Sequence, residues 1–134
     1  MLKEPILIVD DNPLNLKLER LLLEVEGYQV QIAKSAEDAL KTLESFHPRL
    51  ILMDYGLPGM DGLELARKLK AEIQTRDIII LIVTSYDQRG DEERVMAAGC
   101  DGYIHKPIDT KSFPQVVADF LRGGKQGTGH SGNN

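Results

Sequence analysis

Residues 50–62 read LILMDYGLPGMDG, an apolar run that stops at the carboxylate Asp54 and enters a loop with three glycines. Two further runs, ILIV at 6–9 and IIILIV at 78–83, are equally continuous. A strand with one face in water alternates apolar and polar residues, whereas a strand covered on both faces is apolar throughout. These three runs therefore predict the buried central strands of a parallel sheet.

The other segments complete a regular alternation of strands and helices. We expect strands at Pro5–Val9, Gln29–Ala33, Arg49–Met53, Asp77–Val83 and Gly102–His105. Between and after them, the spacing of apolar residues predicts helices from Pro13 to before Gly27, over 35–45, 62–73 and 88–98, and from about Ser112. Because crossovers between parallel strands are right-handed, the fold class is α/β: a doubly wound, five-stranded parallel sheet with helices on both faces.

Local signals indicate how the first and last helices begin. Asn12 is a preferred N-cap residue, and Pro13 suits the first helical position after it. Ser112 with Gln115 has the spacing of a capping box, and Pro114 is tolerated only in the first turn of a helix. We therefore expect regular helix to start at these two places.

The apolar stripes of the helices predict which side chains are buried. The first helix has a stripe at i, i+4, i+7, i+8 and i+11, formed by Leu14, Leu18, Leu21, Leu22 and Val25. The third is predicted to pack through Leu65, Leu69 and Ile73. The last has a stripe formed by Phe113, Val116, Val117, Phe120 and Leu121.

Length and composition describe one soluble domain. We expect it to cover residues 1–122 of the 134, followed by a small, polar, disordered tail at 123–134. The net charge of −5 argues against a broad nucleic-acid surface, and no apolar run reaches the ~20 residues that membrane insertion needs. The single cysteine, Cys100, cannot form an internal disulfide, which favours the cytoplasm. We interpret it as a small buried hydrophobe.

Polar residues gather where the predicted strands end. Asp10 and Asp11 end the first strand, Asp54 the third, Thr84 and Ser85 the fourth, and His105, Lys106 and Pro107 the fifth. In an open parallel sheet, ligands bind in the crevice outside the carboxyl ends of the strands. We therefore expect these groups to converge at one edge.

The chemistry of these groups points to phosphoryl transfer. Three carboxylates repel one another unless a cation joins them, and oxygen ligands favour a hard ion, Mg²⁺, with Mn²⁺ as a substitute. Lys106 and Thr84 suit the charge and the oxygens of a phosphoryl group. Asp54 can then be the nucleophile, which gives an aspartyl phosphate.

These residues, in this order and spacing, resemble the receiver domain of two-component response regulators. The likeness covers about residues 4–122 and implies the CheY-like, flavodoxin-type form of the predicted fold. Within the family, the stretches DNPLNLKLERLLLEVEGY (11–28) and GDEERVMAAGCDGYIHKPI (90–108) are similar to small stand-alone receivers of the DivK type.

The resemblance implies a role for each residue of the site. Asp54 would be phosphorylated by a histidine kinase or a histidine phosphotransfer protein. Asp11, Asp54 and the Gly56 carbonyl would bind Mg²⁺ directly, and Asp10 through water. Lys106, joined to Pro107 by a cis peptide, would contact the phosphoryl group.

The resemblance also implies a switch and an output. Thr84 would move toward the phosphoryl group, which the small Ser85 permits, and Tyr103 would rotate inward. This would reshape the surface of the fourth helix, fifth strand and fifth helix, where a downstream protein binds a monomer or weak dimer. No enzymatic turnover beyond self-catalysed phosphorylation and dephosphorylation is expected. Gly56 and Tyr86 occupy positions that tune dephosphorylation, and they predict slow intrinsic hydrolysis.

Other interpretations stay open on the sequence. Each residue alone has a structural explanation, such as helix capping by the Asp10–Asn12 segment or a turn at Asp54. A phosphatase of the haloacid-dehalogenase type also uses an aspartate nucleophile and Mg²⁺, but its acids are spaced Asp-x-Asp on the first strand. The chain could also be the receiver part of a hybrid kinase or of a larger regulator.

Overall fold

A computed structural model describes residues 3–57, 59–85 and 91–123, apart from the Asp91 side chain. Within these residues, five strands and five helices alternate, as predicted. They are β1 (Pro5–Val9), α1 (Pro13–Val25), β2 (Gln29–Ala33), α2 (Ala36–Thr42), β3 (Leu50–Asp54), α3 (Gly62–Ala71), β4 (Ile79–Thr84), α4 (Asp91–Ala97), β5 (Gly102–His105) and α5 (Phe113–Gly123).

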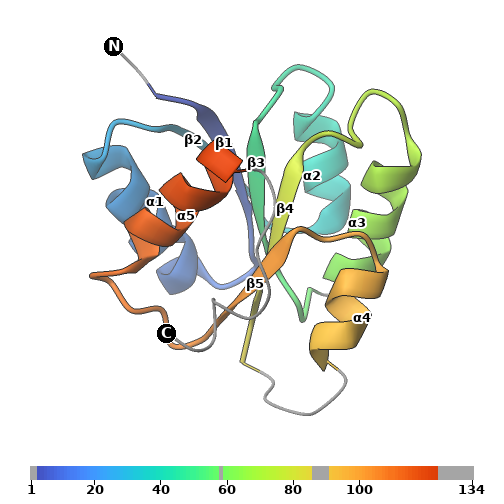
Figure 1. Cartoon of the computed structure of the whole chain (residues 1–134). Coiled ribbons are helices and arrows are strands. Elements are labelled where there is room, and N and C mark those ends of the chain that lie inside the picture. Colours follow the sequence, from blue (N-terminus) through green and yellow to red (C-terminus); the bar gives the residue numbers. More distant parts are fainter. Residues whose placement is uncertain (1–2, 58, 86–90, 124–134) are drawn as a thin grey trace.

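The strands form one parallel sheet in the order β2-β1-β3-β4-β5. The chain steps from β1 outward to β2 and then returns past β1 to β3, so the direction of winding reverses between β1 and β3 (Figure 1). In register, Val9 lies beside Met53, and Asp54 lies beside Val83. The ends of β1 and β3 therefore flank the crevice in which such sheets bind ligands.

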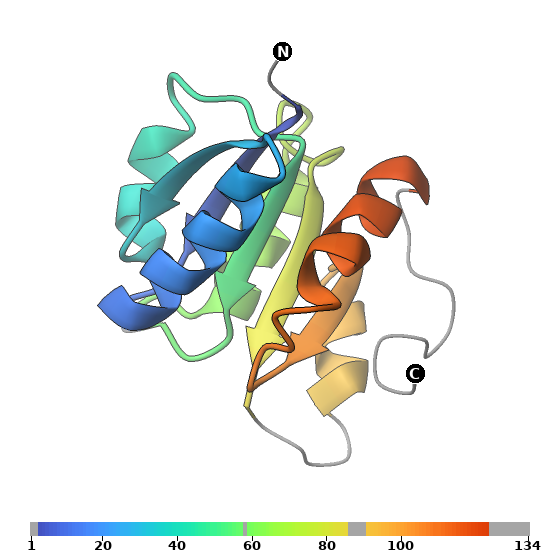
Figure 2. The same cartoon turned by 90° about the vertical axis from the view of Figure 1, so that its left-hand side faces the viewer.

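Helices cover both faces of the sheet and give the domain two cores. Helices α1 and α5 lie on one face, and α2, α3 and α4 lie on the other (Figures 1 and 2). Alternate residues of each central strand enter opposite cores: Ile8 and Leu52 face α1 and α5, whereas Leu7 and Ile51 face the other three helices. This two-sided burial explains the continuous apolar runs.

Helix α1 begins as predicted but packs through a different stripe. The Asn12 side chain accepts hydrogen bonds from the backbone N–H groups of Leu14 and Asn15 at 2.8 and 3.1 Å. The buried residues are instead Leu16, Glu19 and Leu23, and of the predicted stripe only Leu22 packs against a core. The prediction was wrong for the exposed members of that stripe: Leu14, Leu18, Leu21 and Val25. Leucines surround this helix, so their spacing alone fits more than one face.

Smaller differences from the sequence predictions have local causes. Strand β3 begins one residue later than predicted. Strand β4 begins two residues later, because it is preceded by a turn in which Ile78 N–H bonds the Thr75 carbonyl. Helix α2 is shorter and is capped by Ser35. Helix α3 ends at Ala71, where Glu72 is extended, so Ile73 is 75% exposed rather than buried.

At the C-terminal end of the domain, the predicted stripe of α5 packs against the core through Phe113, Val117 and Phe120. The Ser112–Gln115 capping box is replaced, since Ser112 N–H bonds the Asp109 carbonyl and Gln115 donates to Asp119. Helix α5 includes Gly123, the first residue of the predicted tail, and the rest of that tail lies outside the described residues. Residues 88–90 of the predicted fourth helix also lie outside them.

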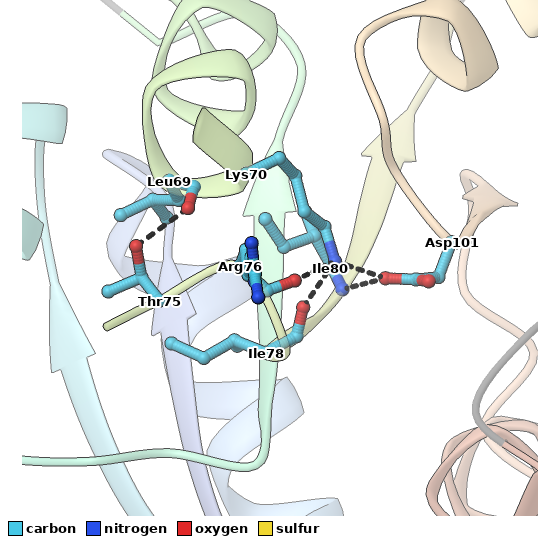
Figure 3. A network of polar contacts seen from close by, with 7 residues as sticks. All are labelled: Leu69, Lys70, Thr75, Arg76, Ile78, Ile80 and Asp101. Carbon is cyan, nitrogen blue, oxygen red and sulfur yellow. Dashed lines mark hydrogen bonds and ion pairs between the residues drawn. The ribbon is translucent and has the colours of Figure 1, made fainter. Parts of the chain in front are cut away.

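A polar network ties α3 to the start of β4 and to the loop before β5 (Figure 3). The Lys70 ammonium donates to the carbonyls of Ile78 and Arg76, at 2.6 and 3.1 Å, and to the Asp101 carboxylate at 3.0 Å. The same Asp101 oxygen accepts the Ile80 N–H at 2.8 Å. All three protons of the ammonium are thereby used, and Asp101 is buried.

Replacing Lys70 by Met is expected to lower the free energy of unfolding by about 2 kcal/mol, because Asp101 and two carbonyls lose their donor. Lys68→Met is the matched control. Lys68 lies on the same helix, and its ion pair with Glu72 is exposed, so this change should cost less than about 0.5 kcal/mol. Urea unfolding of the two variants measures the difference. Equal stabilities would show that the network contributes nothing.

Candidate functional site

The three predicted carboxylates meet at the carboxyl edge of the sheet. Asp10 and Asp11 follow β1, Asp54 ends β3, and one oxygen from each lies within 4.8 Å of the others. Asp10 is buried, Asp54 is half-buried and Asp11 is exposed. The cluster is therefore open on one side and enclosed on the other, and its donors are all carboxylate oxygens, which suit a hard divalent cation.

Asp10 is the enclosed member of this cluster. Its Oδ1 accepts the Asn12 N–H at 2.9 Å, which places the carboxylate at the entry to α1. Burial, the largest cause, raises the pKa of Asp10, and the Asp54 charge adds to the rise, while the Asn12 hydrogen bond and Lys106 oppose it. A cation in the cluster would favour the charged form of this carboxyl.

Lys106 approaches the cluster from the end of β5. Its Nζ lies 3.2 Å from Asp54 Oδ1, and the pair is largely removed from solvent. The Lys106–Pro107 peptide bond is cis, which confirms the prediction. Lys106 N–H also bonds the Thr84 carbonyl at 2.8 Å, so the ends of β4 and β5 hold this lysine in place.

Three further predicted residues lie on β4 and β5 or directly after β4. Thr84 is buried at the end of β4, and Ser85 after it is exposed. Tyr103 is buried among the core residues beneath α4, with its ring edge-on to His105 at a centroid distance of 5.3 Å. Tyr86 lies outside the described residues.

Two of the three glycines that follow β3 differ in their surroundings. Gly56 is exposed, its N–H lies 3.5 Å from Asp54 Oδ1, and a Cβ added to it would meet nothing within 4 Å. Gly62 opens α3 directly behind Asp54, and a Cβ there would lie 2.6 Å from the Asp54 carbonyl oxygen. The first position has room for a side chain, whereas the second is closed by the backbone.

Two further features near the site were not predicted. Glu19 of α1 is buried, and the charges of Asp10, Lys106 and Asp54 act on it. The burial of Glu19 was not predicted because leucines lie on several faces of this helix. A groove of about 410 Å³ beside Lys106 is lined by Asn15, Leu18, Ser85, Lys106, Pro107 and Ile108. The exposed side chain of Leu18 joins this groove to the apolar stripe of α1.

A doubly wound sheet with an acidic crevice and a lysine at its carboxyl edge defines a receiver-type signalling domain. Residues 6–118 match the family model of the response regulator receiver domain, and the chain belongs to that family. It is a phosphorylatable signalling switch of the two-component type, a class that works with histidine kinases or phosphotransfer proteins.

Known relatives agree with this assignment. The polar-differentiation response regulator DivK of Brucella ovis is 41% identical over 116 residues, which cover 87% of this chain and 94% of DivK. The signal receiver domain of a histidine kinase from Syntrophus aciditrophicus is 30% identical, with a TM-score of 0.84, over 98% of this chain and 100% of that one.

A third relative is the receiver domain of the sensor histidine kinase PA1611 from Pseudomonas aeruginosa. It is 28% identical, with a TM-score of 0.81, over 90% of this chain and 98% of that one, and its structure has a magnesium ion coordinated in the active-site cleft. In the present chain, no helix among the described residues is both long enough and apolar enough to cross a membrane.

Proposed function

We propose that Asp54 is the phosphoacceptor of this switch. The observation that carries the proposal is the Lys106–Asp54 pair, with 3.2 Å between Nζ and Oδ1, at the edge of a cluster of three carboxylates. An ion pair that only stabilised the fold would not need Asp10 and Asp11 beside it. A carboxylate that receives a phosphoryl dianion needs positive charge on both sides, which a lysine and a cation site supply.

We further propose that Asp10, Asp11, Asp54 and the Gly56 carbonyl hold Mg²⁺, with Mn²⁺ as a substitute. The carboxylate cluster fits a hard ion, and the magnesium in the Pseudomonas receiver supports the choice. Bound Mg²⁺ would supply positive charge that neutralises the phosphoryl oxygens. The exposure of Asp11 leaves the cluster accessible from solvent.

The protein's own residues would carry out the transfer as follows. An Asp54 carboxylate oxygen attacks phosphorus and forms the acyl phosphate bond, while the bond from phosphorus to the donor nitrogen or oxygen breaks and its electrons leave with the donor. Lys106 releases Asp54 and pairs with a phosphoryl oxygen. The Thr84 hydroxyl donates to another phosphoryl oxygen.

We propose a histidine kinase or a histidine phosphotransfer protein as the donor, and the cytoplasm as the location. The exposed apolar stripe of α1 next to the groove beside Lys106 supports docking of the donor on this side. Output would come from a downstream protein that binds the surface of α4, β5 and α5 on a monomer or weak dimer. Direct binding to nucleic acid is not expected of a chain with this net charge.

The experiment that tests the function is incubation with acetyl phosphate and Mg²⁺, followed by intact mass measurement. We expect a gain of one phosphate that EDTA prevents and that hydroxylamine removes, because an acyl phosphate reacts with this nucleophile and a phosphoester does not. No gain with any small donor or phosphohistidine protein would overturn the proposal. Continuous release of phosphate from an added phosphate ester would favour a hydrolase instead.

Gly56 predicts a long-lived phosphorylated state, because this position offers no side chain to orient an attacking water. A Gly56→Asn variant should lose its phosphate about tenfold faster, since the space around Gly56 accepts a polar side chain. Purified phosphoprotein followed by intact mass without phosphatase measures both lifetimes. A wild-type lifetime of seconds would refute the prediction.

A further inference from the structure

Helix α1 turns a carboxyl group into the core between two leucines. Glu19 is 2% exposed, and Leu16 and Leu23, one turn to either side, pack among the apolar residues beneath α1 and α5. Glu19 Oε2 has no hydrogen-bond partner among the described residues. Leaving a buried polar atom unpaired costs free energy, so an apolar residue would suit folding better at this position.

Within the described part of the chain, the charges that act on Glu19 all belong to the proposed phosphorylation site. They are those of Asp10 at the end of β1, Lys106 at the end of β5 and Asp54 at the end of β3. Burial, followed by the Asp10 charge, raises the pKa of Glu19 to about 8, while Lys106 opposes the rise. In either protonation state this carboxyl group keeps an oxygen that can accept a hydrogen bond.

Lys106 has donor capacity that complements this acceptor. An ammonium group carries three N–H donors, and among residues 3–57, 59–85 and 91–123 the Lys106 side chain donates one hydrogen bond, to Asp54. Of the cations that the structure describes, Lys106 is also the only one whose charge acts on Glu19. The groove beside Lys106 is also lined by Asn15, one helical turn before Glu19, and by Leu18, its neighbour in the chain. The part of α1 that carries the unpaired Glu19 oxygen therefore borders this lysine.

We propose that Glu19 is a positioning residue of the phosphorylation site, and that its carboxyl group is the alternative partner of Lys106. The inference rests on the proposed function. When Asp54 coordinates a metal ion or becomes an acyl phosphate, its ion pair with Lys106 weakens. Glu19 then keeps the ammonium beside the site, from where it reaches the phosphoryl oxygen.

The rate of phosphorylation by acetyl phosphate and Mg²⁺ tests the proposal in Glu19→Gln and Glu19→Leu. Gln keeps an oxygen acceptor and should phosphorylate at the wild-type rate, whereas Leu should be about three- to tenfold slower. In a Lys106→Ala background, Glu19→Leu should cause no further loss, because the residue acts through this lysine. Glu24→Leu is the matched control on the exposed side of α1.

A second measurement does not depend on phosphorylation. The side-chain ¹⁵N signal of Lys106 should shift in Glu19→Leu with Mg²⁺ present, and should stay in place in Glu19→Gln and Glu24→Leu. Wild-type rates in Glu19→Leu, or an equal loss in the Lys106→Ala background, would overturn the positioning role. If the wild-type chain itself gains no phosphate, the proposed function fails, and this inference fails with it.

Discussion

An Asp54→Asn variant is expected to gain no phosphate from acetyl phosphate or from a phosphohistidine donor. The substitution keeps the shape of the side chain but removes the charged oxygen that attacks phosphorus, and a carboxamide is a poor nucleophile. It also removes the negative charge that pairs with Lys106, whose Nζ lies 3.2 Å from Asp54 Oδ1 in the wild-type structure. Intact mass after incubation with the donor and Mg²⁺ measures the effect. The phosphorylated fraction of the variant should lie below the detection limit.

Asp61→Asn is the matched control for this variant. Asp61 is the N-cap of α3 in the same loop, and Asn caps a helix about as well as Asp. This variant should take up phosphate at the wild-type rate. Phosphorylation of Asp54→Asn to the wild-type extent would move the acceptor to another residue. Loss in both variants would instead indicate damage to the loop.

A Gly62→Ala variant is expected to lose about 3 kcal/mol of unfolding free energy and to phosphorylate about tenfold more slowly. The added Cβ would lie 2.6 Å from the Asp54 carbonyl oxygen and 3.4 Å from Met53 Cγ. Because the closer atom belongs to the backbone of β3, the strand or the helix must shift. Any shift displaces the acceptor carboxylate, and small displacements of reacting groups slow catalysis strongly.

Gly56→Ala distinguishes this clash from a general effect of replacing glycine. Gly56 lies two residues after Asp54, and an added Cβ meets nothing within 4 Å. Its unfolding free energy should stay within about 0.5 kcal/mol of wild type. Urea unfolding and the acetyl phosphate assay measure both variants. If Gly62→Ala is as stable as Gly56→Ala, the close packing of α3 against Asp54 does not constrain the site.

Much of the fold could be predicted because its central strands are covered on both faces. The runs at 6–9, 50–53 and 78–83 are apolar throughout, and the structure places them side by side as β1, β3 and β4. The site followed from the same logic, since polar residues at the ends of parallel strands must meet at one edge. Asp10, Asp11 and Asp54 do so within 4.8 Å, and Lys106 joins Asp54.

The sequence was less informative where several faces of a helix are apolar. In α1, leucines occupy positions 14, 16, 18, 21, 22 and 23, so their spacing fits more than one stripe. The predicted stripe is largely solvent-exposed, with Leu14 77% exposed, while Glu19 is buried. Periodicity predicts that a helix is amphipathic, but the angle at which it docks decides which stripe is inside.

The sequence by itself determined the order of the elements, the parallel sheet and the residues at its carboxyl edge, because these depend on local patterns and on the geometry of crossovers. Only the tertiary structure decided which side chains lie behind that edge. The Lys70–Asp101 network and the surroundings of Glu19 each join segments that are distant in the chain. The close approach of Gly62 to Asp54 joins the start of α3 to the end of β3. Such contacts depend on how helices dock against the sheet, and no short-range pattern encodes them.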